Sequence, residues 1–342
     1  LIDQFTQIVG TAQALQGEAN CWPYGYDNSR RHMLPDLVLL PDNEQQVQAI
    51  VQLCYQHHIP ITARGRGTGT TGATVPTQGG VILSTERLNQ IIKVDPDNRL
   101  MVVQPGVTNQ QVQDAAAEHG FFWGPDPTSA AFCSVGGNLA YNSAGPRAVK
   151  YGTTRDNVLG LTAISGKGER IKCGVFTTKG VVGYDLTRLI IGSEGTLAVI
   201  TEATLKLIPQ PETKRTMQAI YSDMATAAAA VSRIMAQPMT PCALEFIDHK
   251  AIEMVREYSS ADLPENAGAL LMIEVDGPTQ GIAAAVDAIQ QAAQGSGLME
   301  FTAANSQEQV AALWATRKAL SPSLRKVAPK KINEDVVVPV SH

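Results

Sequence analysis

The chain has 342 residues, of which 44% are hydrophobic and 17% charged, as expected of a globular protein with a sizeable core. This length favours two or more domains. The net charge of −5 comes without any basic run, so we expect no nucleic-acid partner. No apolar run is long enough to span a bilayer, and none of the cysteines shows C-x-x-C spacing. We therefore expect reduced thiols, no metal site and a cytoplasmic setting.

The first half of the chain predicts short strands and helices separated by glycine-rich loops. Cys21–Asn28 is expected to be an irregular entry segment, because proline and glycine interrupt it. A helix is predicted over Asn43–His58, where Asn43 can cap the first turn and apolar residues recur on one face. The other elements predicted here are strands at Asp36–Leu40, Ile59–Ala63, Gly80–Ser84 and Leu100–Gln104, and a helix at Val107–His119. This order indicates an α+β domain.

A boundary between two domains is predicted near Pro209 and Pro211, which follow the predicted strands Val158–Ser165 and Leu197–Ile208. Beyond it the chain has few glycines, and strands alternate with helices. The strands expected there are Met217–Tyr221, Ala243–Phe246 and Ala269–Val275, and the helices are Ala225–Met235, Lys250–Tyr258, Gly281–Ala293 and Gln307–Val327. This alternation predicts a separate α+β layer of sheet and helices.

The loop Arg64–Gly72, with the sequence RGRGTGTTG, formally contains the G-x-G-x-x-G pattern of dinucleotide-binding folds. That pattern must open a helix, whereas here Pro76, Gly79 and Gly80 are followed at once by a strand, so the Rossmann interpretation fails. Successive amides of a glycine-rich turn still form a concave nest for phosphate oxygens. We interpret the loop as an anion-binding loop, with a plain tight turn as the alternative.

Two further loops have the same character. Gly124–Gly152 is rich in glycine, proline and small polar residues, which build a rigid wall of exposed amides and carbonyls. A plain irregular connection is the alternative, but such long loops are uncommon in compact domains unless they are functional. Ile191–Val199 places Gly192 and Gly195 around Ser193 and Glu194 just before an apolar strand, and a simple hairpin could read this way. All three loops are candidates for holding one ligand.

Taken together, the three loops resemble the flavin-binding half of the vanillyl-alcohol oxidase and p-cresol methylhydroxylase superfamily, nearest to its glycolate oxidase catalytic subunit and D-lactate dehydrogenase branch. The matching text lies at Ala63–Pro76, Gly124–Gly152 and Tyr184–Pro209. The resemblance implies a p-cresol methylhydroxylase-type (PCMH-type) FAD-binding domain of two α+β subdomains over residues 1–212. An α+β cap domain over residues 213–342 would follow, incomplete at its C-terminus, and would close over the flavin.

The resemblance also implies the residues that contact FAD. The first loop would wrap the pyrophosphate with Arg64, Gly65, Arg66, Gly67, Thr68, Gly69, Thr70 and Thr71. The diphosphate and isoalloxazine would be lined by Pro125, Asp126, Ser129, Gly136, Gly137 and Asn138. Nearer the ring would lie Asn142, Ser143 and Gly145, with Tyr151 and Gly152 close behind. The ribose and adenine end would meet Glu194, Gly195, Val199 and Ile200. The first loop has no histidine, so FAD is expected to be non-covalent, with Cys133 a small buried thiol.

The implied reaction removes a hydride and a proton from a 2-hydroxy acid, with flavin N5 accepting the hydride. Arg317 stands in the W-x-x-R position where the resembled branch has an arginine, and a bidentate arginine suits a carboxylate. A solvated helix arginine is the alternative, and Lys331 and Asn333 are weaker candidates for the same pocket. The relatives carry a histidine-rich segment beyond Val336–Val340, which does not occur in this chain. We expect either further residues after His342 or a protein without that chemistry.

The first functional hypothesis is therefore an FAD-dependent oxidoreductase for a small D-2-hydroxy acid, glycolate or D-lactate. It would pass electrons to a quinone, a cytochrome or a partner subunit, in the cytoplasm or at the inner membrane face. Another substrate, such as D-2-hydroxyglutarate or more distantly a cell-wall precursor, is the second hypothesis. A non-catalytic flavoprotein subunit that serves assembly is the third.

Overall fold

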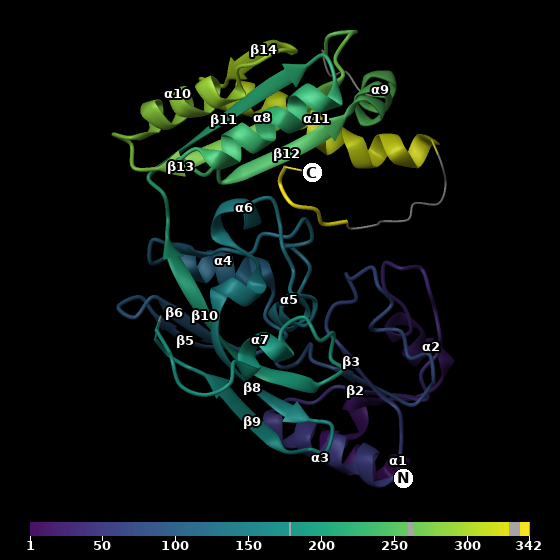
Figure 1. The fold of residues 1–342 in the computed structure, drawn as a ribbon. Coiled ribbons are helices and arrows are strands. Elements are labelled where there is room, and N and C mark those ends of the chain that lie inside the picture. Colours follow the sequence, from purple (N-terminus) through teal and green to yellow (C-terminus); the bar gives the residue numbers. More distant parts are fainter. Residues whose placement is uncertain (178, 259–262, 328–335, 342) are drawn as a thin grey trace. The chain divides into compact units, whose positions relative to one another are not determined.

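The computed structural model describes residues 1–177, 179–258, 263–327 and 336–341 (Figure 1). The chain forms two compact units. The first unit contains Leu1–Gly145 and Tyr151–Gln210, and the second contains Pro146–Lys150 and Pro211–His342. The first unit ends at Gln210. The sequence predicts a domain boundary close to this position, after residue 212.

The first unit begins with a small mixed sheet in the order β1-β2-β4-β3, in which β2 and β3 run parallel to β4. Its strands are β1 (Ala14–Leu15), β2 (Leu37–Leu39), β3 (Ile61–Arg64) and β4 (Val81–Ser84). The helices α1 (Ile2–Val9) and α3 (Glu44–Gln56) pack on it. The predicted cap of α3 is confirmed, because Asn43 Oδ1 accepts a hydrogen bond from Gln46 N at 2.9 Å.

A larger sheet has the order β5-β6-β10-β8-β9, and every adjacent pair in it is antiparallel. Side chains alternate along its central strand β10, so Val199 joins the core around α3 and Ile200 joins the core on the other face. That second core is covered by α4, α5 and α7. The bounds of these elements are β5 (Ile91–Asp95), β6 (Leu100–Val103), β7 (Phe121–Trp123, paired with the end of β10), β8 (Val158–Ser165), β9 (Arg170–Gly174), β10 (Ala198–Pro209), α4 (Asn109–Ala117), α5 (Val135–Tyr141) and α7 (Leu186–Ile190).

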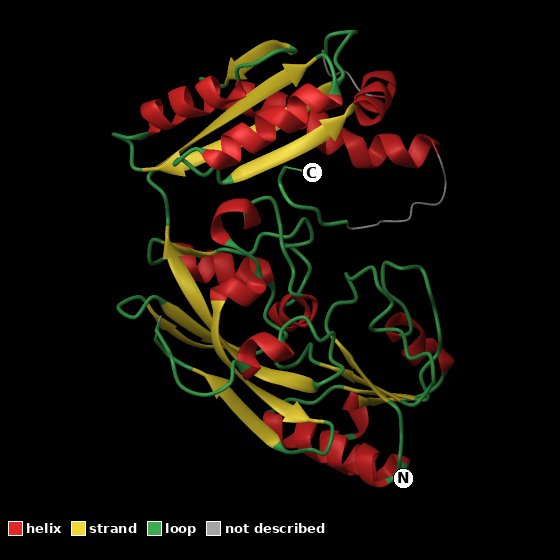
Figure 2. Cartoon of the chain, viewed as in Figure 1, coloured by secondary structure: helices red, strands yellow, loops and turns green. Residues whose placement is uncertain are grey.

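The second unit is a four-stranded antiparallel sheet in the order β12-β13-β11-β14, with helices on both faces (Figure 2). Residues of alternate parity on β13 face the two sides: Leu271 and Ile273 pack against α8 and α10, whereas Leu270 and Met272 pack with α9 and α11. The elements are β11 (Thr213–Tyr221), α8 (Met224–Ala236), β12 (Ala243–Asp248), α9 (His249–Tyr258), β13 (Ala269–Gly277), α10 (Ile282–Ala293), β14 (Leu298–Ala303) and α11 (Gln307–Val327). The predicted sheet and helices of this unit are confirmed.

Several local predictions for the first unit were wrong. Cys21–Asn28 is not wholly irregular, because α2 (Glu18–Cys21) and the 3₁₀ helix η2 (Trp22–Tyr24) occupy its first half, and Pro23 is accommodated in the first turn of η2. The glycine-rich stretch Gly124–Gly152 is not one loop, because α5 and α6 (Ala148–Tyr151) lie within it. The two remaining 3₁₀ turns are η1 (Thr11–Gln13) and η3 (Thr154–Asn157).

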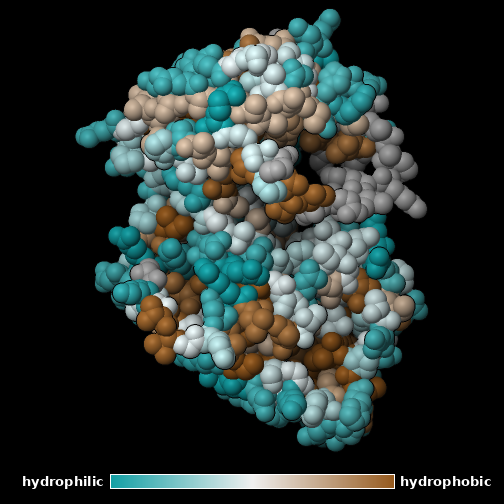
Figure 3. Space-filling model, viewed as in Figure 1, coloured by the Kyte–Doolittle hydropathy of each residue, from teal (hydrophilic) through white to brown (hydrophobic). Residues whose placement is uncertain are grey.

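Exposed apolar side chains gather on the segment that connects β9 to α7. Val182 is 96% and Tyr184 is 95% exposed, and Val181 is also exposed, as is Leu189 on α7. Figure 3 shows separate brown hydrophobic patches on the surface of the molecule. The side chains of Val181, Val182 and Tyr184 therefore contribute little to the core of the first unit.

We expect Asn43→Ala to lower the free energy of unfolding by about 1 kcal/mol, because it removes the side-chain acceptor at the start of α3. Asn43→Ser, which keeps an acceptor, serves as the matched control. Urea unfolding followed by circular dichroism measures both. Equal stability of the alanine and wild-type proteins would show that this cap does not hold α3.

Candidate functional site

The short helix α5 is the element on which the three glycine-rich loops meet. It begins at Ser134, whose Oγ accepts a hydrogen bond from Gly137 N at 3.3 Å. It ends at Asn142, which adopts the left-handed conformation with φ 51°. Gly136 and Gly137 are poor helix formers, but they leave the first turn without side chains that would keep another backbone away.

The first glycine-rich loop lies along α5. A Cβ atom built on Gly65 would come within 2.7 Å of Ser134 Oγ, and one on Gly69 within 2.5 Å of the Tyr141 hydroxyl. At both positions a larger residue would have to displace a side chain at α5, so glycine lets the loop lie this close to the helix. The loop touches α5 near its start and again at its end, so its residues between these contacts follow the helix.

Consecutive backbone amides in the first part of this loop have no partner within the described part of the chain. Among the described residues, none accepts a hydrogen bond from the amides of 65–69. Backbone amides in folded proteins are nearly always paired with protein or water, so a run of unpaired amides in a glycine turn is suited to an anion. The side chain of Arg66 is exposed and has no hydrogen bond or ion pair with a described residue. Its positive charge is available at the same loop.

The end of the loop is held by the Tyr141 hydroxyl. It accepts hydrogen bonds from Thr70 N and Thr71 N, each at 2.7 Å, and it donates to Thr71 Oγ1 at 2.7 Å. Thr71 Oγ1 in turn donates to Glu194 Oε2 at 3.1 Å. Asp27 Oδ2, on a buried side chain, accepts from Gly72 N at 2.9 Å. The amides of 70–72 are thus satisfied within the protein, unlike those that precede them.

The Arg64 guanidinium is engaged inside the first unit. It donates to Tyr26 O at 2.6 Å, to Pro23 O at 3.2 Å and to Thr74 Oγ1 at 3.2 Å. Burial lowers the pKa of Arg64, and this side chain is only 7% exposed. A phosphate contact from this guanidinium would require these bonds to break. Arg64 therefore orders the entry segment against the loop in this structure.

The third loop closes on the other end of α5. Gly192 N donates to Leu139 O and Glu194 N donates to Ala140 O, each at 2.9 Å. These bonds add donors at the C-terminal turn of α5, where Leu139 O also accepts from Asn142 N at 3.1 Å. Glu194 itself adopts a positive φ of 53°. The loop continues through Gly195 into β10, where Val199 and Ile200 are side chains of the two cores.

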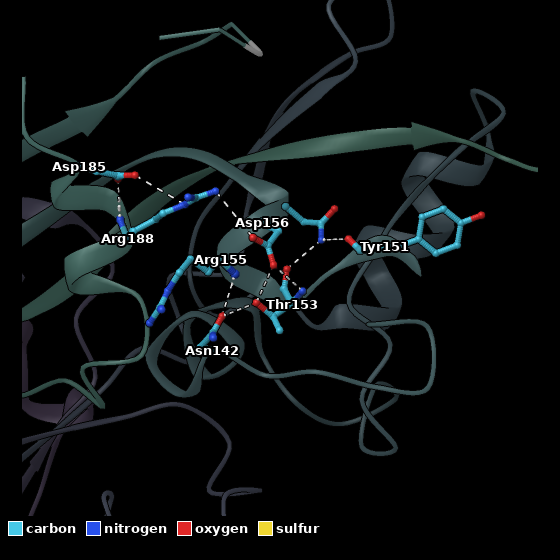
Figure 4. Close-up of polar contacts among 8 residues, drawn as sticks. Asn142, Tyr151, Thr153, Arg155, Asp156, Asp185 and Arg188 are labelled. Carbon is cyan, nitrogen blue, oxygen red and sulfur yellow. Dashed lines mark hydrogen bonds and ion pairs between the residues drawn. The ribbon is translucent and has the colours of Figure 1, made fainter. Parts of the chain in front are cut away.

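Asn142 ties α5 to the segment that follows α6. Its Oδ1 accepts hydrogen bonds from Thr153 Oγ1 at 3.0 Å and from Arg155 N at 2.8 Å (Figure 4). In the same group Tyr151 O accepts from Asn157 Nδ2 at 2.8 Å. Gly152, at φ 77°, packs on Asp156, and Ser143 O accepts from Thr154 N at 3.1 Å. The side-chain oxygen of Asn142 is therefore occupied by hydrogen bonds within the protein.

The remaining predicted residues form the wall beside α5. Gly145 packs closely on Asp126, and Pro125 O accepts from Asn109 Nδ2 at 3.1 Å. Ser129 O accepts from Cys133 N at 2.8 Å, which closes the turn before α5. Asn138 Nδ2 is buried and has no hydrogen-bond partner among the described residues. An unsatisfied buried amide calls for a further acceptor.

Cysteine chemistry does not contribute to this wall. Cys133 is 3% exposed, and burial raises the pKa of its thiol, so the thiol stays protonated. Within the residues that the structure describes, no group of three or more histidine, cysteine, aspartate or glutamate side chains could hold a metal ion. No described helix is long and apolar enough to cross a membrane.

The candidate substrate residues lie in the second unit or outside the described residues. Arg317 lies on α11, and its Nε donates to Glu245 Oε2 on β12 at 2.6 Å. Lys331 and Asn333 fall outside the described residues. The structure thus brings most predicted cofactor residues around α5, whereas Val199 and Ile200 are core side chains. Sequence reasoning missed Asp27, Tyr141 and Thr153; only the position of Tyr141 inside the glycine-rich stretch pointed to it.

Comparison with known families agrees with this geometry. Residues 35–174 match the FAD binding domain family, and residues 210–342 match the C-terminal domain of FAD linked oxidases. The fold and site define the class as an FAD-binding α+β domain followed by an oxidase C-terminal domain. The chain belongs to the FAD-linked oxidases. The resemblance drawn from the three loops is confirmed, and so is FAD as the cofactor.

The most similar relatives include two proteins named glycolate oxidase subunit GlcD. The one from Bacillus subtilis is 38% identical over 99% of this chain, which spans 72% of the relative. The one from Escherichia coli is 33% identical over 93% of this chain, which spans 64% of the relative. A D-lactate dehydrogenase from Archaeoglobus fulgidus is 42% identical over 65% of this chain and 50% of its own length.

Solved structures confirm the fold. A p-cresol methylhydroxylase with substrate bound aligns with a TM-score of 0.77 at 19% identity, covering 93% of this chain and 70% of that one. An alkyldihydroxyacetonephosphate synthase aligns with a TM-score of 0.76 at 22% identity, covering 95% and 68%. At such identities the likeness concerns the fold alone. The PCMH-type α+β fold predicted from the sequence is confirmed.

The residues around α5 fit an FAD molecule. The unpaired amides of 65–69 suit a pyrophosphate, and the orphan Asn138 amide needs an acceptor of the kind that a flavin ring offers. Ser193 Oγ, in the third loop, is a second buried polar atom without a partner among the described residues. The helix α5 and two segments beside it therefore carry polar groups without partners among the described residues.

We expect Tyr141→Phe to weaken FAD binding about tenfold, because it removes the hydroxyl that holds Thr70 and Thr71 and so loosens the loop. Equilibrium titration of the apoprotein with FAD, followed by flavin fluorescence, measures the effect. Tyr55→Phe, at an exposed tyrosine outside the site, is the matched control. Unchanged affinity in Tyr141→Phe would mean that the hydroxyl is dispensable for the shape of the loop.

Proposed function

We propose that the protein oxidises a small D-2-hydroxy acid, glycolate or D-lactate, to the 2-oxo acid and passes the electrons to an acceptor other than oxygen. The observation that carries the proposal is the run of unpaired amides at 65–69 beside α5, together with relatives named glycolate oxidase subunit and D-lactate dehydrogenase. When bound, FAD supplies the hydride acceptor, and the protein supplies binding, orientation and electrostatics.

Each group of residues has a distinct role in this proposal. The amides of 65–69 and the Arg66 side chain would hold the pyrophosphate, assisted by the hydroxyls of Thr68 and Thr70. The hydroxyl of Thr71, also a candidate, already donates its proton to Glu194 and would act by ordering the loop. Asn138 would donate to the flavin, and Glu194 would face the ribose. The remaining residues, which shape the wall, are Pro125, Asp126, Ser129, Gly136, Gly137, Asn142, Ser143, Gly145, Tyr151 and Gly152.

Arg317 is the proposed partner of the substrate carboxylate. Its guanidinium has five N–H donors, and only Nε is used by a described residue. Two of the remaining donors can bind a carboxylate in the bidentate geometry that makes such pairs strong. Lys331 and Asn333 are assigned to the same substrate, and FAD is held without a covalent bond.

D-2-hydroxyglutarate is the second candidate substrate. A relative named D-2-hydroxyglutarate dehydrogenase, from Stutzerimonas stutzeri, is 28% identical over 99% of this chain and 74% of its own length. This substrate has a second carboxylate, so it needs another cation besides Arg317. The word subunit in the names of the glycolate oxidase relatives supports a partner protein as the electron acceptor.

Anaerobic addition of D-lactate or glycolate to the FAD-loaded protein should bleach the visible flavin absorbance, because the substrate reduces the cofactor without a further acceptor. L-Lactate is the matched control for the configuration at the α-carbon, and it should leave the flavin absorbance unchanged. Bleaching by D-2-hydroxyglutarate alone would select the second substrate. A flavin that none of these acids bleaches is the result that a non-catalytic flavoprotein subunit predicts.

Arg317→Met should lower kcat/KM for D-lactate about ten- to hundredfold, because it removes a charge-assisted pair of about 1.5–3 kcal/mol. The FAD content should not change. Arg215→Met is the matched control, at an exposed arginine of the same unit whose hydrogen bonds to described residues go to Thr213 and Lys214. Loss of FAD in Arg317→Met would place this arginine at the cofactor instead of the substrate.

A further inference from the structure

The contact between Arg317 and Glu245 uses one edge of the guanidinium. Arg317 Nε donates to Glu245 Oε2 at 2.6 Å, and the side chains are 36% and 21% exposed. Among the residues that the structure describes, none accepts a hydrogen bond from Nη1 or Nη2 of Arg317. Both Nη groups are therefore without a partner within the described part of the chain, while Nε is fixed by Glu245.

A second carboxylate anchors the same helix. Glu274 is 4% exposed and accepts hydrogen bonds from Trp314 Nε1 at 2.9 Å, Thr216 Oγ1 at 2.8 Å and Lys214 Nζ at 2.9 Å. Trp314 and Arg317 are three residues apart on α11, so they lie on the same helix face. A buried carboxylate with three donors is fully satisfied, and it fixes where α11 meets the sheet.

Strand register places the two carboxylates on one face of the sheet. Glu245 on β12 lies opposite Met272 on β13, and Glu274 lies two residues further along β13. Leu313 and Leu320 of α11 pack on the apolar part of the same face, with Met272 and Leu270. The backbone of α11 is thus held by packing and by Trp314. What these contacts leave open is the direction of the Arg317 guanidinium.

We propose that Glu245 is a positioning residue that presents the two Nη groups of Arg317 to the substrate carboxylate. This inference rests on the proposed function. A partly exposed ion pair contributes little to stability, so the larger consequence of the contact is orientation. A guanidinium held at Nε loses less rotamer freedom when a carboxylate binds, and preorganisation of this kind strengthens binding. The orientation of the guanidinium depends more on the acceptor oxygen of Glu245 than on its charge.

The test compares Glu245→Ala with Glu245→Gln, each with FAD bound. Glu245→Ala should raise the KM for D-lactate about tenfold with little change in kcat, because the guanidinium loses its fixed edge. Glu245→Gln keeps an acceptor for Nε and should stay within about threefold of the wild type. In the Arg317→Met background, Glu245→Ala should add no further effect, since it acts through Arg317.

Glu274→Gln and Trp314→Phe are the structural controls, because they loosen the α11 anchor without touching Arg317. They should lower thermal stability more than Glu245→Ala does, without its selective rise in KM. A bleachable wild-type flavin with an unchanged KM in Glu245→Ala would overturn the inference alone. A rise in KM caused by Glu245→Ala that is equally large in the Arg317→Met background would also overturn the inference. A wild-type flavin that no 2-hydroxy acid bleaches would contradict the proposed function, and the inference with it.

Discussion

The hydrogen bonds that join α5 to the surrounding loops are the constraint on which the first unit depends. The carbonyls of Leu139 and Ala140 accept hydrogen bonds from the amides of Gly192 and Glu194. The Tyr141 hydroxyl accepts hydrogen bonds from the amides of Thr70 and Thr71. Segments far apart in the chain are thereby fixed to one short helix. The amides of 65–69 are held in place without being satisfied, because the bonds that order the loop lie on either side of them. A preorganised set of donors binds an anion without a further ordering cost.

In the second unit, buried and half-buried carboxylates hold the side chains of α11, whereas in the first unit backbone amides hold the loops on α5. Glu274 is buried beneath α11, and a buried charge is tolerated only with hydrogen-bond partners and a cation, here Lys214. An aliphatic residue at that position would avoid the desolvation cost of a buried charge, but it would give Trp314 Nε1 no acceptor. The polar end of this sheet face therefore helps to anchor α11 on the sheet, whereas the guanidinium of Arg317 is held by a separate carboxylate, Glu245. Positioning of the proposed substrate arginine begins with residues that need not touch substrate.

Much of this architecture could be predicted from the sequence, and what could not has identifiable causes. The apolar run Ala269–Val275 located β13, and the helices around it followed from the order of strand and helix patterns along the chain. Asn43 marked the start of α3. The helix α5 was hidden because Gly136 and Gly137 are poor helix formers, although Ser134 and Asn142 are typical caps. Contacts such as Tyr141 to Thr70 or Asp27 to Gly72 join distant segments, and no local pattern records them. The engagement of Arg64 within the protein was equally invisible.

We propose that the backbone amides of 65–69 bind the FAD pyrophosphate. Hydrogen–deuterium exchange of the apoprotein and the FAD-loaded protein reads those amides themselves. FAD should slow exchange across 65–69 by about tenfold or more, while the amides of 70–72, already bonded within the protein, should change much less. If the protein binds FAD tightly yet exchanges the amides of 65–69 as fast as the apoprotein does, these amides do not hold the pyrophosphate.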